Sequence, residues 1–403
     1  MSKKLIVVCL INFFVAALMG LALRFSFLGD IGINYRFLTH AHSHVAMLGW
    51  VYLMLFVLIV HYFVPNKKPI YNRLFWITQM AVVGMMVSFP IQGYAAISIS
   101  FSTLHILCSY YFVHLIWKHH ETQSLVTSRL LRASLLFMLL STLGVWCLGP
   151  AVSMLGQASA FYQIAIQFFL HFQFNGWFLL VVIAIFFHLL QMEDSKQFRL
   201  FFKLLISSIL LTLALPFQWF APHKLLVYAN GFGVLLQLAS LYFFLKLIKP
   251  KFPMLVKQQS TLVIYLYSFA LLCLILKIGL QLCSLFPEFS QAVYMHRNFV
   301  IGFIHLLMLG VISGFLMAFM LEMTLVNHTR DLYFGIFSFI TGFALTEVLL
   351  LIQGIKFYNG SGMLHNYYLL LFIFSILLPL GLAILLYNFI KHNNYATQTS
   401  KTT

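Results

Sequence analysis

The sequence predicts an all-α, polytopic integral membrane protein, a bundle of about 12 transmembrane helices. Hydrophobic residues make up 62% of the 403 residues, charged residues only 8%, and phenylalanine alone occurs 44 times. Apolar runs of about 20 residues recur along the chain, and an α-helix needs this length to cross about 30 Å of hydrocarbon. A soluble core does not need so many apolar residues, so the lipid bilayer is the expected environment of the chain.

Counting the apolar runs gives twelve expected spans. Pro90 and Gly93 interrupt one long apolar stretch, which we divide into the third and fourth spans between residues 96 and 97. The expected spans are 5–27, 40–64, 74–96, 97–117, 130–148, 161–190, 200–217, 225–248, 261–285, 299–321, 332–355 and 367–390. Residues 1–392 should form a single transmembrane domain, followed at 393–403 by a polar, disordered cytoplasmic tail.

The basic residues are distributed unevenly over the predicted loops. Most of the 24 lysines and arginines fall on one side, together with Lys3 and Lys4 near the N-terminus. By the positive-inside rule both termini are cytoplasmic, and the expected location is a bacterial inner membrane. The net charge of +16 then reflects topology. Because no basic cluster is interleaved with polar residues, as a phosphate-binding groove would need, nucleic acid is not an expected partner.

Three histidines occur at the mouth of the second span, in the segment 40–50 (HAHSHVAMLGW). A polar side chain in hydrocarbon must find a partner or face a cavity, so these imidazoles are candidates for a functional site. On a helix with about 100° per residue, His40 and His44 share one face and His42 points nearly opposite. At most two of the three can therefore serve one site.

A histidine followed by a glycine five residues later occurs in three spans: at 44–49 (HVAMLG), 171–176 (HFQFNG) and 305–310 (HLLMLG). These are the second, sixth and tenth spans, so the pattern recurs every four helices and suggests a pseudo-threefold arrangement of four-helix units. A small residue just below a histidine lets either a bulky planar group or a neighbouring helix come close.

The predicted topology places these histidines in the outer half of the membrane. Neutral imidazole is the usual axial ligand of a b-type haem, and two of them from facing helices form a low-spin, electron-transferring site. His44 and His305 are the expected pair, with His42 or His40 as alternatives to His44. His296 lies nine residues before His305, about 13 Å away on the opposite face. It cannot serve the same iron and is a separate candidate for binding a cofactor.

Two further sets of polar residues accompany these histidines. Arg36 and Arg297 lie at the predicted outer boundary, where they either pair with haem propionates or anchor the helices at the interface. The sixth span carries a polar stripe about 18 Å long. The stripe lines a ligand cavity or proton path, or it is a polar seam between helices. It consists of Gln163, Gln167, His171 and Asn175.

Lys277 and Glu347 are the charged residues that lie deep within spans, in the ninth and eleventh. Both spans ascend, and each residue lies about 15 positions from the cytoplasmic start of its span. The matching depths favour a buried ion pair, and proton transfer through Glu347 is the alternative.

Together these features resemble subunit I of the haem-copper oxidase superfamily. The likeness rests on twelve spans with cytoplasmic termini, a pattern repeated every four helices, and outer-half histidines on the second, sixth and tenth spans. The phrase HAHSHVAMLGW followed by a long apolar run is similar to the divergent cytochrome oxidase and nitric oxide reductase relatives, including NnrS-like membrane proteins of the nitrosative-stress response.

The resemblance implies that His44 (or His42) and His305 ligate a low-spin haem b, and that His171 is the copper-side histidine of the sixth span. The family carries two adjacent copper-binding histidines on its seventh span, whereas 200–217 has none and only His223 follows. Two closely spaced histidines on the tenth span are also missing. The full copper-ligand set is therefore not found, and activity as an oxidase or nitric oxide reductase is left open.

The expected function is that of a haem-binding membrane protein in respiratory electron transfer or in the handling of O2 or NO. Copper is a second cofactor that the resemblance implies, and a redox partner, a small gas and additional membrane subunits are the expected partners. The alternative is a cofactor-free membrane transporter, which uses intramembrane His, Lys and Glu side chains to bind a substrate or to couple protons. The candidate metal ligands are His171, His44, His305 and His223.

Overall fold

The protein is an all-α, multi-pass membrane protein, as predicted. The computed structural model describes residues 3–122, 124–324 and 329–399, and these residues form helices and connecting turns without a strand. Twelve helices among them are long and apolar enough to cross a membrane. Their bounds agree with the predicted spans to within about five residues in eleven of the twelve helices. The fifth is longer than expected, because it extends over Leu125–Leu155 where the prediction was 130–148.

The helices group into two compact units. Unit 1 comprises Met1–His120 and Leu316–Thr403, and unit 2 comprises Glu121–Phe315. The prediction of one transmembrane domain over residues 1–392 stays a prediction.

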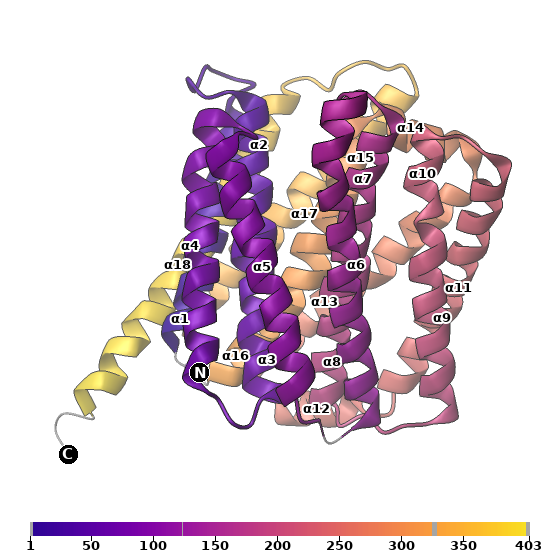
Figure 1. Ribbon diagram of the computed structural model, residues 1–403. Helices are drawn as coiled ribbons and strands as arrows, with labels where there is room; N and C mark the ends of the chain where they lie inside the picture. The colour runs from indigo at the N-terminus through magenta and orange to yellow at the C-terminus, as the bar shows by residue number, and fades with distance from the viewer. Residues whose placement is uncertain (1–2, 123, 325–328, 400–403) are drawn as a thin grey trace. The chain divides into compact units, whose positions relative to one another are not determined.

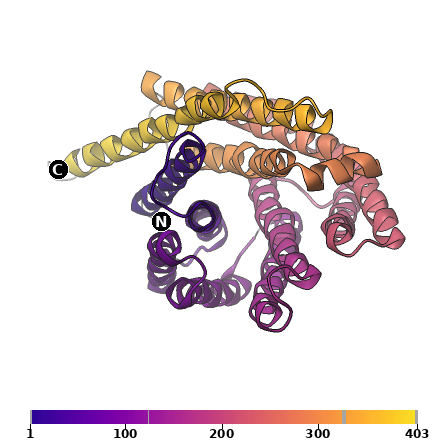
Figure 2. The same ribbon diagram turned by 90° about the horizontal axis from the view of Figure 1, so that it is seen from above.

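In unit 1, the second span consists of three successive helical segments, α2, η1 and α3. α1 begins and α18 ends at the same end of the unit, and α17 and α18 lie side by side (Figures 1 and 2). The elements are α1 (Lys3–Phe25), α2 (Tyr35–His44), η1 (Val45–Tyr52), α3 (Leu53–Phe63), α4 (Pro69–Gln92), α5 (Ala96–His119), most of α16 (Ser313–Thr324), α17 (Arg330–Tyr358) and α18 (Tyr367–Thr399). Residues 393–399, within the segment predicted to be a disordered tail, are thus helical.

The third and fourth spans separate at 93–95, a few residues before the expected boundary between 96 and 97. Pro90 lies inside α4, and the helix ends two residues later. Gly93 has φ 62° and ψ −141°, a backbone conformation that residues with a Cβ rarely adopt. A Cβ at this position would also collide with the ring of Phe37. The turn therefore depends on glycine.

Unit 2 contains the fifth to ninth spans and most of the tenth, and serine side chains begin several of its helices. Ser124, Ser195 and Ser260 each accept a hydrogen bond from a backbone N–H in the first turn of the helix that follows. The elements are α6 (Leu125–Leu155), α7 (Ala160–His171), η2 (Phe172–Phe178), α8 (Leu179–Leu189), α9 (Lys196–Thr212), α10 (Ala214–Phe220), α11 (Lys224–Ile248), α12 (Phe252–Gln258), α13 (Thr261–Leu282), η3 (Cys283–Leu285), α14 (Pro287–Met295), α15 (Arg297–His305) and η4 (Leu306–Ile312).

The seventh span is broken into α9 and α10 at Leu213. Pro216 lies four residues after Thr212 and has no N–H to donate to its carbonyl. The N–H of Leu213 bonds to the carbonyl of Leu211 rather than to that of Ile209. The carbonyl of Ile209 is therefore open to a donor from another helix.

Candidate functional site

The three His-Gly motifs share one backbone feature. In each, the α-helix ends at the histidine, and the glycine lies in a π-helical segment, where an N–H bonds to the carbonyl five residues back. The segments are η1 after His44, η2 after His171 and η4 after His305. π-helical turns are rare and are frequent at functional sites. The predicted recurrence of the motif is thus confirmed in the local backbone, whereas a threefold arrangement of the whole chain stays a prediction.

The three spans that carry the motif are also the most buried of the twelve. In their most apolar windows, 83%, 72% and 56% of residues are buried for the second, sixth and tenth spans, against at most 50% in each of the others. A larger share of these spans than of the others is enclosed by protein, so their buried polar groups depend on partners within the protein.

Each π-helical segment has a side chain that bonds to a carbonyl within it or at its start. The extra residue of a π-helical turn leaves carbonyl groups without the usual partner four residues on, and hydrocarbon offers no water to replace it. The hydrogen bonds run from Asn12 Nδ2 to Gly49 O (2.9 Å), from Asn175 Nδ2 to His171 O (3.3 Å) and from Ser313 Oγ to Met308 O (2.8 Å).

The glycines of two motifs admit neighbouring helices. A Cβ on Gly49 would lie 2.9 Å from Val82 Cγ1 and 3.1 Å from Asn12 Cβ, and one on Gly176 would lie 2.7 Å from Phe137 Cβ. Real Cβ atoms do not approach so closely. Of the two alternatives left open by the sequence, the close approach of a neighbouring helix therefore holds at both positions.

The rotation of the second span agrees with the predicted faces of its histidines. The rings of His40 and His44 both pack on Phe89 and Tyr94. The ring centroids of His40 and Tyr94 lie 4.6 Å apart, and those of His44 and Phe89 lie 4.5 Å apart. His42 points the other way, toward α1, where its Nδ1 lies 2.8 Å from the carbonyl oxygen of Ala16. His42 thus links α2 to α1, and His44 is the better ligand candidate of the two.

The hydrogen bond of His44 determines which ring nitrogen can bind a metal. Its Nδ1 lies 2.8 Å from the carbonyl oxygen of His40, one helical turn back. A carbonyl oxygen only accepts, so Nδ1 carries the proton and Nε2 keeps its lone pair. Imidazole ligands in proteins are commonly held in this way by a hydrogen bond from the other nitrogen.

Two residues beside His44 were missed in the sequence. The hydroxyl of Tyr94 lies 3.4 Å from His44 Nε2, and Tyr94 is 47% exposed in the short link after Gly93. His105 on α5 is an electrostatic neighbour of His44, is buried, and has an Nε2 without a hydrogen-bond partner. The interruption at Gly93 and a histidine within an apolar span were the signals that could have found them.

His171 holds two helices together in unit 2. Its Nε2 donates to the carbonyl oxygen of Ile209 at 2.7 Å, the group left open by the break between α9 and α10. The Nε2 atom is therefore engaged with the backbone. The sequence left open whether the polar stripe lines a cavity or proton path, or holds helices together. For His171 the structure favours a contact between helices.

The other members of the stripe have mostly local contacts. Gln163 donates from Nε2 to the carbonyl of Gln157 at 3.0 Å, near the start of α7. Gln167 is half-buried. Asn175 bonds to the carbonyl of His171, and its Oδ1 is buried without a partner. The expected four-residue spacing holds on α7. Gln163 and Asn175, however, donate hydrogen bonds to backbone carbonyl groups that are near in the sequence.

The remaining candidates lie at helix starts or at the end of α15. His305 is half-buried as the last residue of α15. His296 is the N-terminal cap residue of that helix, rather than part of its opposite face, and exposed Arg297 follows it. Arg36 is exposed in the first turn of α2. His223 is exposed and caps α11, its Nδ1 accepting from the N–H of Leu225 at 3.2 Å.

Lys277 is 1% exposed, and its amine donates to Gln281 Oε1 of the same helix at 2.9 Å. Glu347 is half-buried on α17 of unit 1. The predicted ion pair between them joins residues of the two units and stays a prediction, as does His44 with His305. In unit 2, the ion pairs among the described residues join Arg129 and Arg199 to Asp194, near the starts of α6 and α9.

No preformed copper site occurs in the described part of the chain. Among residues 3–122, 124–324 and 329–399, no three or more His, Cys, Asp or Glu side chains gather so as to hold a metal ion. Nε2 of His171 and Nδ1 of His223 are already bonded to backbone groups. Within unit 2 these two nitrogen atoms are therefore already engaged, and copper binding by His171, His223, His44 and His305 stays a prediction.

Comparison with known proteins adds no assignment to this geometry. The chain matches neither a model of a protein family nor a curated protein. What is established is a multi-pass helical membrane protein with three histidine-led π-helical segments.

Proposed function

We propose that the protein is a haem-binding membrane protein on the plan of haem-copper oxidase subunit I, with His44 as an axial ligand of a b-type haem. The observation that carries the proposal is the state of His44. Its Nδ1–H is bonded to the carbonyl of His40, which leaves Nε2 as the donor atom that iron takes. His44 also begins one of three matching π-helical segments.

The surroundings of His44 fit a haem edge in character. Phe89 and Tyr94 supply aromatic surface, and both pack on the imidazole ring. For iron to reach Nε2, the Tyr94 side chain has to move aside, which its place in an exposed link after Gly93 allows. In the predicted topology this link lies at the outer face, so Arg36, at the start of the same helix, is placed to pair with a propionate.

A bound haem would supply one-electron chemistry, and the chain would supply imidazole ligands, apolar enclosure and orientation. The sequence prediction names His305 as the second ligand. A role in respiratory electron transfer or in the handling of O2 or NO, in a bacterial inner membrane, follows from the same resemblance. Copper is left out of the proposal because the seventh span lacks the paired histidines that the resemblance requires.

The absorption spectrum of the purified protein in detergent tests the proposal. We expect a sharp Soret band in the oxidised protein and α and β bands after reduction with dithionite, because two imidazoles make a low-spin haem. Metal analysis of the same sample should find iron. A folded, helical protein without absorption in the visible range would overturn the proposal and favour the alternative, a cofactor-free transporter.

A further inference from the structure

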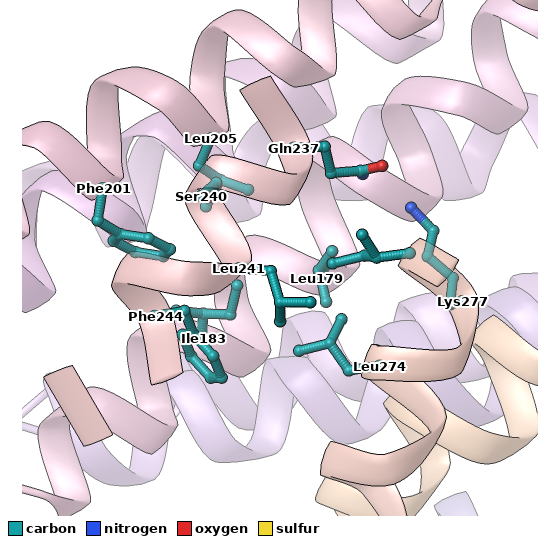
Figure 3. Close-up of a pocket in the computed structure, with 11 residues that line it drawn as sticks. Leu179, Ile183, Phe201, Leu205, Gln237, Ser240, Leu241, Phe244, Leu274 and Lys277 are labelled. Atoms are coloured by element: carbon teal, nitrogen blue, oxygen red, sulfur yellow. The ribbon is translucent and has the colours of Figure 1, made fainter. Parts of the chain in front are cut away.

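Unit 2 contains a polar seam between α11 and α13 that the haem proposal does not use. Lys277 lies at its inner end and is 1% exposed, with Gln237 of α11 across from it at 4% exposed. Figure 3 shows the Lys277 amine and the side-chain oxygen of Gln237 pointing toward one another at one edge of a cavity. Burying an ammonium group in an apolar setting is costly unless polar groups or water solvate it.

The cavity beside Lys277 is small. Its volume is about 20 Å³, which is room for about one water molecule. Its walls are otherwise mostly apolar and include Leu179, Ile183, Leu241 and Leu274. A substrate of ordinary size does not fit in this space, so the natural occupant is a water molecule.

The polar groups of the seam favour a bound molecule that can donate a hydrogen bond, such as water, over an anion. Gln237 Oε1 is buried without a partner, and so is Asn230 Oδ1, two turns earlier on α11. Leaving such a buried acceptor unsatisfied costs about 1–3 kcal/mol. A water molecule can donate to Gln237 Oε1 and accept from the Lys277 amine, whereas an anion would be repelled by the oxygen atom.

The seam continues from Lys277 to the exposed end of α13. Lys277 donates to Gln281 Oε1 at 2.9 Å, and Ser284 Oγ donates to the carbonyl of Gln281 at 2.7 Å. Asn230 Nδ2 donates to Ser284 Oγ at 3.2 Å. Cys283, which directly precedes Ser284 in the sequence, is exposed. Polar groups therefore follow one another over about 10 Å of helix axis, from Lys277 to Ser284.

A histidine from another helix lies near Lys277. His171 of α7 is its electrostatic neighbour, and the ring of Phe303 on α15 lies 5.7 Å from the amine. The described residues that line the cavity from α8, α9 and α11 include no acidic or basic side chain. No carboxylate of the cavity wall therefore holds Lys277 in its charged form.

From this arrangement we infer that Lys277 is a proton-binding residue, which a hydrated seam formed by Gln237, Asn230, Gln281 and Ser284 connects with the end of unit 2 at η3. A proton that arrives along the seam as a hydronium ion passes to the lone pair of the neutral amine and leaves a water molecule, and it returns by the reverse step. In the predicted topology that end faces the outside, so Lys277 would respond to the outer pH. This inference does not depend on haem.

Solid-state NMR of the full chain in lipid vesicles, with lysine labelled by 15N at the amine, tests the inference. The Lys277 resonance is identified by its loss in Lys277→Met. We expect it to receive magnetisation from water and to shift as the buffer pH is changed. Lys246, which is exposed at the end of α11, is the reference for a lysine in full contact with water.

Seam variants distinguish the proposed route from water that enters elsewhere. Gln237→Leu and Asn230→Leu should each lower the rate of transfer from water to the Lys277 amine at least tenfold. Gln163→Leu, half-buried in unit 2 but outside the seam, should leave it unchanged. A wild-type Lys277 resonance without transfer from water, or transfer that neither seam variant slows, would overturn the inference. Since the readout is the amine itself, this result is independent of whether the protein carries haem.

Discussion

His44→Ala is expected to abolish the low-spin haem spectrum of the protein. The substitution removes the Nε2 atom that the bond from Nδ1 to the His40 carbonyl presents as a ligand. Loss of one of two axial imidazoles converts a low-spin iron to a high-spin one or releases the haem. The difference spectrum of the reduced minus oxidised protein should therefore lose its sharp α and β bands, and haem content per chain should fall severalfold.

His42→Ala is the matched control, since it removes an imidazole from the same turn of α2. His42 is bonded to the Ala16 carbonyl and packs against Gly20, so its loss weakens the contact of α2 with α1. We expect a stability lower by about 0.5–1.5 kcal/mol, the net contribution of one hydrogen bond, and an unchanged haem spectrum. If His42→Ala lost the spectrum and His44→Ala kept it, the assignment of the ligand would be wrong.

Gly144→Ala is expected to destabilise unit 2 strongly. A Cβ on Gly144 would collide with the backbone carbonyl oxygen of Ala165 and lie 3.0 Å from the backbone N of Phe169, both on α7. Backbone atoms cannot rotate away, so α6 and α7 have to separate. Overpacking of this kind costs about 1–3 kcal/mol and at times more. Unfolding in mixed micelles of increasing denaturing detergent measures the change.

Gly279→Ala offers a control in the same unit and with the same chemistry. Gly279 lies inside α13, and a Cβ there meets nothing within 4 Å, so the substitution adds only helix propensity. The stability should stay unchanged or rise by up to about 1 kcal/mol. Equal losses in both variants would show that the α6–α7 contact does not depend on the missing side chain at position 144.

The membrane spans were predictable because hydropathy acts over about 20 residues at once. Each span is long enough that errors of a few residues at its ends do not change the count, and the twelve observed spans match the twelve predicted. The break at Gly93 was predictable for a local reason, since proline and glycine act on the backbone directly.

The π-helical segments were not predictable from helical periodicity. The sequence shows the repeated His-Gly spacing, but periodicity arguments assume 3.6 residues per turn, which fails over 45–52 and its two counterparts. The polar stripe illustrates the consequence. Its spacing of four residues holds on α7, but Asn175 lies within η2 and bonds back to the His171 carbonyl.

The partners of the polar residues depend on tertiary contacts that sequence reasoning does not contain. His171 bonds to a carbonyl that is open only because α9 breaks before Pro216. Lys277 bonds to Gln281 of its own helix and faces Gln237, two contacts that its depth in the span did not indicate. Polar residues in an apolar span were visible in the sequence, but which of them face each other follows from how α11 and α13 pack.

Low-temperature electron paramagnetic resonance of the oxidised protein, grown once with ordinary and once with 15N-labelled histidine, tests imidazole-ligated haem most directly. We expect a low-spin ferric signal whose nitrogen hyperfine couplings change with the label, because the axial nitrogens come from histidine. A signal that the label leaves unaltered, or an oxidised protein without an iron signal, would contradict the proposal.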